Sequence, residues 1–469
     1  MLFYFLKRPY FFIKLDSMKK QIARRDFIKS TAIATSTTLV SSCVSANLTT
    51  KQEKGSWKKC ALHSHTLWSD GQSLPEVAIT EYKKHGFDML VMTEHNGCPD
   101  DPHMWMRVLD ENIDMWPPIL TIDEYNRTKK AFKNSLITKF YSYKTFVRLK
   151  TFPELKKEFE EPNKFLLAGG EEITTSSRQK DGTRRDCHLN VFNVEKTFLQ
   201  PKTQSPSDCI KKCVDIFNNL QSKSKRRMFM MLNHPFWRLW DVLPDDVLQN
   251  PAITHFEICN NSAQDAMGDL LSPDKFWDVI LANRIEKKQG VIYATASDDT
   301  HFYDPKRVDG AGGINNAWTM ALVKGEFTVD NTLSAIADGN CYPTTGVLLK
   351  SFEFDYTSKT LKVEVDAKEG VNYRIEFITT KRGFDHTYKT QRVEPKDKKL
   401  ARDIPIYSDE IGKVVKSVNG TSASYKMAFD DLYIRAKIVS DKPTRMWLIK
   451  KAYCFPKNEC AWTQPFANV

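Results

Sequence analysis

The chain has no long apolar run, no paired cysteine motif and no common nucleophile motif. No stretch of about 18 apolar residues is present to span a bilayer, and the mean hydropathy of the 469 residues is −0.47. Its ten cysteines are scattered without a C-x-x-C pair, which excludes a zinc knuckle. A G-x-S-x-G turn, a P-loop and internal repeats are also missing from the sequence. We therefore expect neither a serine hydrolase of that kind nor a P-loop nucleotidase.

Positive charge is concentrated at the amino terminus. The formal net charge is +11, but residues 1–43 hold eight Lys or Arg and two Asp, which leaves +5 for the rest of the chain. Such a modest charge over so long a segment does not favour DNA or RNA, so we expect no nucleic-acid partner. The length is sufficient for a barrel with an accessory module.

Two targeting patterns lie in this basic segment. Arg24-Arg25-Asp26-Phe27-Ile28-Lys29 resembles the twin-arginine export signal, and Val40-Ser41-Ser42-Cys43 resembles the lipobox of bacterial lipoproteins. The resemblance implies export of a folded protein to the bacterial cell envelope, periplasmic and acylated at Cys43, with membrane contact through this lipid anchor only. Translation would then start at Met1 or Met18. The alternative is a basic leader without a targeting role.

Beyond residue 56, apolar segments of strand length alternate with helical patterns. The expected strands are 60–65, 88–93, 165–169, 187–194, 228–233, 254–259 and 291–297. They are apolar without strict alternation, as parallel strands covered on both faces are. The expected helices include 75–85, 208–220, 273–288 and 329–338, all of which begin at or near a proline or end next to a glycine. This order predicts an α/β fold with a (β/α)7 barrel over residues 57–346.

Two segments depart from this alternation. Residues 97–164 form an aromatic-rich insertion after the second strand, with a helix expected at 155–161. From residue 347 the pattern changes to alternating apolar and polar residues, for example in 351–356 and 361–365. Such alternation indicates half-buried antiparallel strands, so 347–469 is predicted to be a β-rich, sandwich-like accessory domain. Residues 1–56 remain as signal and linker.

Six histidines follow or end the predicted strands, where a parallel barrel builds its active site. They are His63, His65, His95, His188, His234 and His301, with Glu172 and Asp299 at comparable positions. A single buried histidine is more often a core residue than a ligand. Six at strand ends, with carboxylates among them, instead indicate a site for zinc, manganese or iron.

The same residues resemble the motifs of the polymerase-and-histidinol-phosphatase (PHP) superfamily. His63-Ser64-His65 with Asp70, and Thr93-Glu94-His95-Asn96, are similar to its first two motifs. The later ones are similar to Gly170-Glu171-Glu172-Ile173-Thr174, Cys187-His188, Asn233-His234-Pro235 and Ser297-Asp298-Asp299-Thr300-His301. The resemblance covers residues 57–345, and it implies a PHP-type barrel with a metal-dependent phosphoesterase activity.

The resemblance also implies how two or three metal ions are held. His63, His65, Glu172 and Asp299 would hold the first, and Glu172 would bridge to a second on His188 and His234. Asp70, His95 and His301 would hold a third, or one of them would donate a proton. Many members have histidine at the position of Asp70, so the resemblance does not decide whether the third site is occupied. Glu172 and Asp299 are preferred over their neighbours Glu171 and Asp298 because they fit the motif spacing.

Basic and aromatic residues near these motifs suggest a substrate. Arg178, Arg184, Arg185 and Arg238 could pair with phosphate oxygens, although any single one of them is more often a solvated loop charge. Trp237 and Trp240 flank Arg238, while Trp105, Trp116 and Tyr125 lie in the insertion. They could accept an apolar or aromatic leaving group, or pack the insertion's own core.

The leading hypothesis is an exported hydrolase that cleaves a small-molecule phosphate ester with a metal-activated water. Metal-dependent hydrolysis of an amide, a carbamate or a carboxyl ester is the alternative reaction. A lipoprotein that uses the same barrel only to bind a ligand is the alternative without catalysis.

Overall fold

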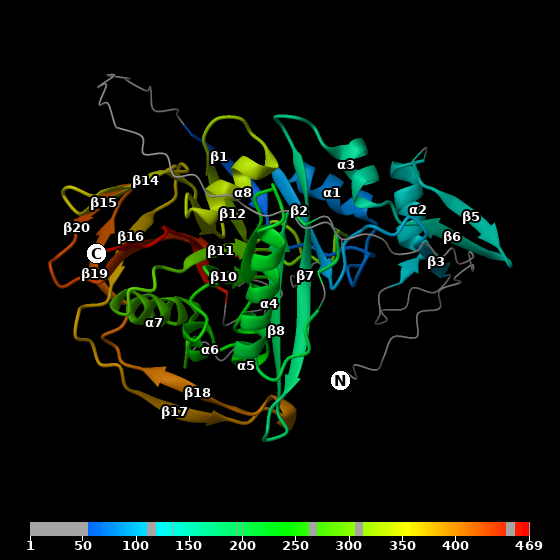
Figure 1. The fold of residues 1–469 in the computed structure, drawn as a ribbon. Helices are drawn as coiled ribbons and strands as arrows, with labels where there is room; N and C mark the ends of the chain where they lie inside the picture. Colours follow the sequence, from blue (N-terminus) through cyan, green and yellow to red (C-terminus); the bar gives the residue numbers. More distant parts are fainter. Residues whose placement is uncertain are drawn as a thin grey trace, which may run out of the picture. The chain divides into compact units, whose positions relative to one another are not determined.

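The seven apolar segments that the sequence predicts as strands all lie in one sheet of the computed structural model (Figure 1). The structure describes residues 55–109, 119–133, 135–194, 196–198, 200–261, 270–304, 313–446 and 455–468. The export pattern at Arg24 and Arg25, and the lipobox at Cys43, lie outside the described residues, as does Trp116.

The central sheet has fourteen strands. Its order is β11 (Tyr293–Ser297), β10 (His255–Asn260), β9 (Phe229–Leu232), β8 (Arg184–Phe192), β7 (Leu166–Arg178), β2 (Met89–His95), β1 (Ser56–Ala61), β12 (Trp318–Val323), β13 (Cys341–Thr344), β22 (Asn458–Trp462), β21 (Tyr433–Pro443), β16 (Tyr373–Thr379) and β19 (Lys413–Asn419), with β23 (Phe466–Ala467) paired to β21. A mixed α/β fold with a large central sheet is therefore confirmed.

The predicted parallel direction is wrong for one of the seven strands. β8 runs antiparallel to both β7 and β9, whereas β1, β2 and β7 are mutually parallel, as are β9, β10 and β11. Only residues 179–183 join β7 to β8, and a parallel neighbour would need a crossover of a dozen or more residues. Gly182 permits this turn because its φ is +82°, a left-handed value that glycine adopts without strain.

The described residues do not form the closed barrel that the sequence predicts. β11 is an edge strand that, within the described part of the chain, pairs only with β10. On its other edge, backbone N–H groups donate to side chains instead of to a second strand. Ala296 N–H donates to Thr319 Oγ1 over 3.0 Å, and Ala294 N–H donates to Gln464 Oε1 over 3.0 Å. A single parallel bridge joins Ser64 to Thr300 beyond the strand ends. The sheet thus curls until the segments that follow β1 and β11 meet, without a continuous ladder between these two strands.

Helices cover this sheet at the predicted positions. They are α1 (Pro75–Lys84), α4 (Pro206–Gln221), α7 (Pro273–Glu286) and α8 (Val329–Ala337), with the short α5 (Trp237–Trp240) and α6 (Pro244–Leu248) between β9 and β10. Ser205, Ser272 and Thr328 cap the first turns of α4, α7 and α8 by accepting a backbone N–H. No helix among the described residues is both long and apolar enough to cross a membrane.

The insertion after β2 forms its own small sheet, in the order β4-β3-β6-β5. Its elements are β3 (Trp105–Leu109), β4 (Leu120–Thr121), α2 (Ile122–Ala131), β5 (Thr138–Tyr141), β6 (Lys144–Arg148) and α3 (Phe152–Phe159), the predicted helix. Tyr125 is buried in an apolar cluster with Val108, Leu120 and Val147. This aromatic residue therefore packs the core of the insertion.

The C-terminal region is β-rich, as predicted. β14 (Leu349–Asp355), β15 (Thr360–Val365) and β20 (Ser422–Lys426) form one sheet, and β17 (Tyr388–Val393) and β18 (Arg402–Tyr407) form a hairpin that contains the 3-10 turn η1 (Lys398–Leu400). β22, β21, β16 and β19 instead extend the central sheet, since Thr344 of β13 pairs with Ala461 of β22. One sheet therefore runs across the predicted boundary at residue 347, and a separate sandwich is not confirmed.

A buried ion network fastens this region to α7. Arg435 of β21 lies within 2.6 and 2.8 Å of the two Asp278 carboxylate oxygens, and within 3.1 Å of Asp274. Tyr433 also donates to Asp278 over 2.7 Å. Since the Arg435 and Asp278 side chains are almost inaccessible to water, neither charge can be solvated if its partner is lost.

We predict that Arg435→Met lowers the free energy of unfolding by about 3–5 kcal/mol, because it leaves Asp278 buried without its main counterion. Urea unfolding followed by circular dichroism measures the change. Lys350→Met is the matched control: its pair with Glu364 is solvent-exposed, and we expect a loss below about 1 kcal/mol. Equal losses in the two variants would contradict the assignment.

Candidate metal centre

The curled sheet brings the eight sequence-predicted histidine and carboxylate ligands together with Asp70. His63 and His65 follow β1, His95 ends β2, Glu172 lies in β7, His234 follows β9, and Asp299 and His301 follow β11. His188 lies in the middle of β8, opposite Thr174, and not at a strand end, because this strand is reversed. Its position is near the others because β7 extends far past its neighbour β2.

Glu172 lies at the middle of the cluster. Nitrogen atoms of five imidazoles lie 2.8–3.3 Å from its carboxylate oxygens, namely those of His63, His65, His95, His188 and His234. Asn233 Nδ2 donates to Glu172 Oε1 over 2.8 Å. The register of β2 and β7 places His95 directly beside Glu172.

Three overlapping groups of side chains have the spacing of a metal site. His63, His65 and Asp299 form the first, with the Asp299 Oδ1 atom 3.4 and 3.1 Å from the two Nε2 atoms. Glu172, His188 and His234 form the second. A further set combines His63 and His234 with Glu257.

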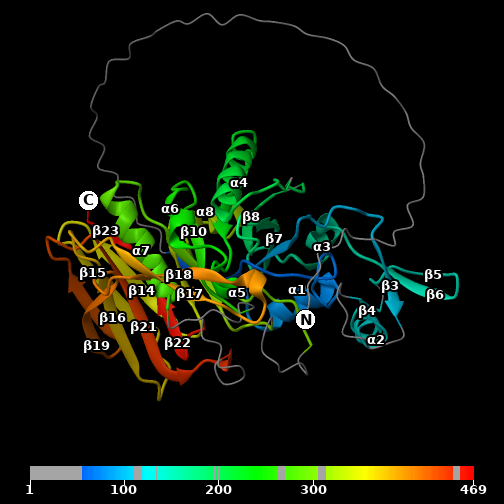
Figure 2. The same cartoon turned by 90° about the horizontal axis from the view of Figure 1, so that it is seen from below.

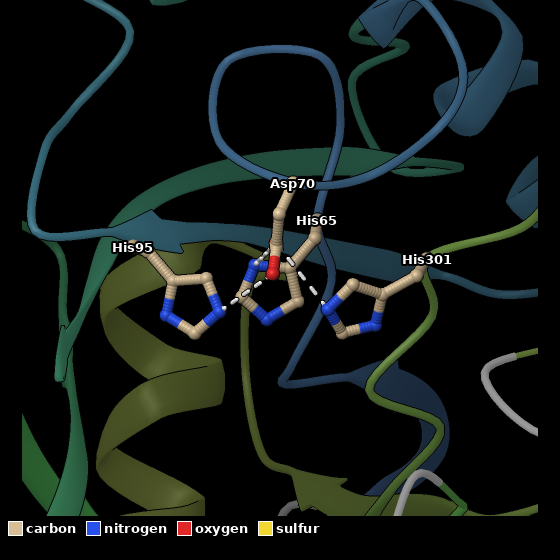
Figure 3. Close-up of side chains that lie close together, drawn as sticks. All are labelled: His65, Asp70, His95 and His301. Atoms are coloured by element: carbon tan, nitrogen blue, oxygen red, sulfur yellow. Dashed lines mark ion pairs between the residues drawn. The ribbon is translucent and has the colours of Figure 1, made fainter. Parts of the chain in front are cut away.

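The remaining group contains Asp70, which lies between His95 and His301 (Figure 3). Its carboxylate oxygens are 3.2 Å from His95 Nε2 and 3.3 Å from His301 Nε2. His65 Nδ1 is 3.5 Å away, and the His65 ring stacks on both other rings at 4.4 Å. Asp70 thus takes the place that the sequence predicted for it beside His95 and His301.

The carboxylates adjacent in sequence to Glu172 and Asp299 face elsewhere. Glu171 accepts the Phe198 N–H, and burial raises the pKa of its carboxyl to about 8. Asp298 accepts three backbone N–H groups, from residues 315 to 317, over 2.6–2.9 Å. The orientation of the side chains agrees with the choice of Glu172 and Asp299 as the ligands.

The imidazoles compensate the buried negative charge. Burial alone would raise the pKa of Glu172, but His95, His63 and His188 hold this pKa well below its ordinary value. Burial would likewise lower the pKa of His301, yet the Asp70 carboxylate raises it to about 9. The carboxylates and imidazoles therefore stabilise one another in an interior where burial alone would disfavour a charge of either sign.

The donor atoms fit a metal centre. His63 Nε2, His65 Nε2 and Glu172 Oε2 are fully buried and have no hydrogen-bond partner among the described residues. They nevertheless lie within 3.4 Å of other ligand atoms. Buried polar atoms that face one another without hydrogen-bond geometry are expected where a cation belongs. Imidazole and carboxylate donors suit zinc, manganese or iron.

Further residues orient these ligands. Glu257 Oε1 is 3.0 Å from His63 Nδ1, which leaves Nε2 of that ring directed into the cluster. Glu94 accepts from the Thr66 and Ser69 hydroxyls and so holds the loop that carries Asp70. Glu257 lies within the predicted strand 254–259, and its contact with His63 joins residues that are remote in sequence.

The four arginines differ in their contacts. Arg184 and Arg238 both contact Asp186, over 2.9 and 2.7 Å, so two positive charges share one carboxylate. Arg185 is bound to Asp246 over 2.7 Å, and Arg178 is exposed at the end of β7. Of the four, only Arg184 and Arg238 therefore contact the same carboxylate, that of Asp186, close to His188.

An aromatic ring lies beside the ligands. Trp237 is 5.1 Å from the His188 ring and 5.4 Å from the His234 ring, and the Arg238 guanidinium stacks on it at 4.2 Å. Trp240, in contrast, is completely buried. Trp237 and Arg238 are each only half-buried, so they lie where a substrate can reach them.

Comparison with known proteins gives distant structural likenesses. No family model matches the chain, and no curated protein does. A two-domain protein from Bacteroides vulgatus, containing a predicted PHP-like metal-dependent phosphoesterase, is 14% identical with a TM-score of 0.35, over 88% of this chain and 96% of that chain. A protein from Bifidobacterium adolescentis, provisionally named a metal-dependent phosphoesterase, is 10% identical with a TM-score of 0.25, over 60% and 94%.

We predict that Glu257→Gln weakens metal binding about 10- to 100-fold, because the neutral amide holds the His63 ring less firmly. Competition with a chromogenic chelator measures the affinity for zinc. Glu171→Gln is the matched control, since this carboxyl is buried beside the cluster but faces Phe198. Equal affinities for the two variants would show that Glu257 does not support the metal.

Proposed function

We propose that the protein is a metal-dependent hydrolase that cleaves phosphate esters. The observation that carries this proposal is the convergence of buried, unsatisfied imidazole nitrogens on the Glu172 carboxylate. The motif resemblance to the PHP superfamily supports the same reaction class. No serine or cysteine nucleophile is required.

Each group of ligands would hold a different metal ion. His63, His65, Glu172 and Asp299 would hold one divalent ion, and Glu172, His188 and His234 a second. Bound there, two ions would lower the pKa of a water, orient the ester and offset the negative charge on the phosphoryl oxygens. Glu172 suits a bridging position because its two oxygens face different imidazoles. The fixed side chains thus position the reactants before reaction.

Asp70, His95 and His301 would hold a third ion or manage the leaving-group proton. His301 Nδ1 lies 2.8 Å from the backbone oxygen of Asp299, which makes Nδ1 the protonated nitrogen and directs Nε2 toward Asp70. A proton held between His301 Nε2 and Asp70 is available to a departing alkoxide.

The substrate class follows from the half-buried residues beside the second group. Arg184 and Arg238, which both contact Asp186, present guanidinium groups of the kind that bind phosphate oxygens. Trp237 offers a flat apolar surface to the rest of the ester. We infer a small phosphate monoester or diester with an apolar or aromatic group.

We predict that His65→Ala and Asp299→Ala each lower kcat by at least about a thousandfold, because each removes a ligand from the first group. Hydrolysis of p-nitrophenyl and bis-p-nitrophenyl phosphate, with metal content by elemental mass spectrometry, measures the effect. His103→Ala, on an exposed loop, is the control and should retain activity. Wild-type rates in either ligand variant would refute the metal assignment.

The same assay separates the alternatives. Two or three metals per chain without phosphatase activity would redirect the search to carboxyl esters, amides and carbamates. Failure to bind metal after reconstitution would favour the non-catalytic ligand-binding lipoprotein.

We further propose export to the cell envelope by the twin-arginine route, with acylation at Cys43. Replacing Arg24 and Arg25 by lysine is predicted to retain the chain in the cytoplasm, because the export signal requires both guanidinium groups and not merely positive charge. Cell fractionation and immunoblotting measure the distribution. Arginine in place of Lys19 and Lys20 keeps the charge and should be exported. Continued delivery of the Arg24→Lys, Arg25→Lys chain would exclude this route.

A further inference from the structure

The β5–β6 hairpin of the insertion exposes an unusual number of large apolar side chains. Nine such side chains are exposed among the described residues, and four of them lie between residues 137 and 143. Phe140 is 72% and Tyr143 95% exposed, and Ile137 and Tyr141 are the other two. Figures 1 and 2 show this hairpin reaching beyond α2 and β3. We call residues 137–144 the hairpin tip.

The aromatic rings of the tip face several directions. Phe140 and Tyr141 are consecutive in β5, so their side chains lie on opposite faces of the hairpin. All four residues of β5 are exposed, which means that neither face is covered by another element. Tyr143 lies in the turn, where Ser142 and Tyr143 have φ of 49° and 60°. Such a turn favours Asn-Gly, so an aromatic ring is placed at the outermost position despite backbone strain.

The charged residues of the hairpin sequence and its flanks, from 125 to 153, are all basic. No Asp or Glu occurs between Glu124 and Glu154, whereas eight basic residues do: Arg127, Lys129, Lys130, Lys133, Lys139, Lys144, Arg148 and Lys150. Arg127, Arg148 and Lys150 are neutralised by carboxylates outside that stretch. Among the described residues, Lys133, Lys139 and Lys144 have no such carboxylate, and Lys139 lies over the Trp105 ring at 3.9 Å.

We propose that the hairpin tip inserts into the interface of an anionic lipid bilayer. Rings that point in several directions fit a fluid apolar medium better than a groove, which would cover one face only. Aromatic rings favour the headgroup level of a membrane, and the lysines behind them complement anionic lipid. The contact goes beyond the lipid anchor expected at Cys43 and does not depend on it, nor on the hydrolase activity.

Exposed aromatic residues elsewhere in the chain provide a comparison. Tyr356 is 72% and Phe429 94% exposed, which matches Phe140 and Tyr143. Their sequence neighbours include Asp355, Asp430 and Asp431, and Lys381 lies 2.7 Å from both Asp430 and Asp431. Acidic groups therefore adjoin these rings, and the lysine beside Phe429 is paired with them. The proposal therefore assigns membrane contact to the first pair and not to the second.

The test uses the full chain with Cys43→Ser, which cannot be acylated, and flotation with vesicles of equal parts phosphatidylglycerol and phosphatidylcholine. We expect this chain to float with these vesicles, and less with phosphatidylcholine alone or at high salt. Phe140→Ser with Tyr143→Ser should bind the vesicles at least about tenfold more weakly, because the two rings that would enter the bilayer are lost. Lys133→Gln with Lys144→Gln should lower both the binding and its salt dependence.

Tyr356→Ser with Phe429→Ser is the matched control and should float like the parent chain. Circular dichroism should show all variants folded, since each of the altered aromatic and lysine side chains is exposed. The proposal is overturned if the parent does not float with the anionic vesicles, or if Phe140→Ser with Tyr143→Ser floats unchanged. Equal losses in the control would also overturn it. A parent that ignores vesicles but retards a single-stranded oligonucleotide would identify the tip as a nucleic-acid contact.

Discussion

The electrostatics of one buried carboxylate govern the arrangement of the central sheet. Glu172 is surrounded by five imidazoles, and its carboxylate would not be stable in the interior without such partners. The ligands come from strands that are far apart in sequence, so the sheet must curl to bring β1, β9 and β11 near β7. The local satisfaction of β11 by Thr319 and Gln464 allows this curl without a closed ladder.

The long β7–β8 hairpin serves two purposes. It carries both Glu172 and His188, and it also holds Arg184 and Asp186 beside them. Because these residues lie on paired strands, their spacing is set by the ladder instead of a loop. Two of the metal ligands and one of the arginines proposed to contact phosphate are therefore positioned by one rigid element.

The two proposed contacts of the protein make different physical demands. The metal centre needs buried, mutually compensating charges on paired strands and their ends. The hairpin tip instead exposes apolar rings and lysines that the fold leaves uncovered. A hydrolase held at a membrane surface through both its anchor and this tip would keep its metal centre close to substrates that reach that surface.

Several elements could be predicted from the sequence because their causes are local. The apolar runs and the proline and glycine boundaries located seven strands and their helices, and the motif spacing favoured Glu172, which faces the imidazoles, over Glu171. The reversal of β8 was missed because its apolar pattern resembles a parallel strand, although Asp181-Gly182 is a turn signal. The contact of Glu257 with His63, the sharing of Asp186 by two arginines, and the open side of β11 join residues remote in sequence. The sequence by itself determined which side chains could bind metal, because residue type and strand position are local properties. Only the tertiary structure decided which of them meet, because that depends on how the whole sheet curls.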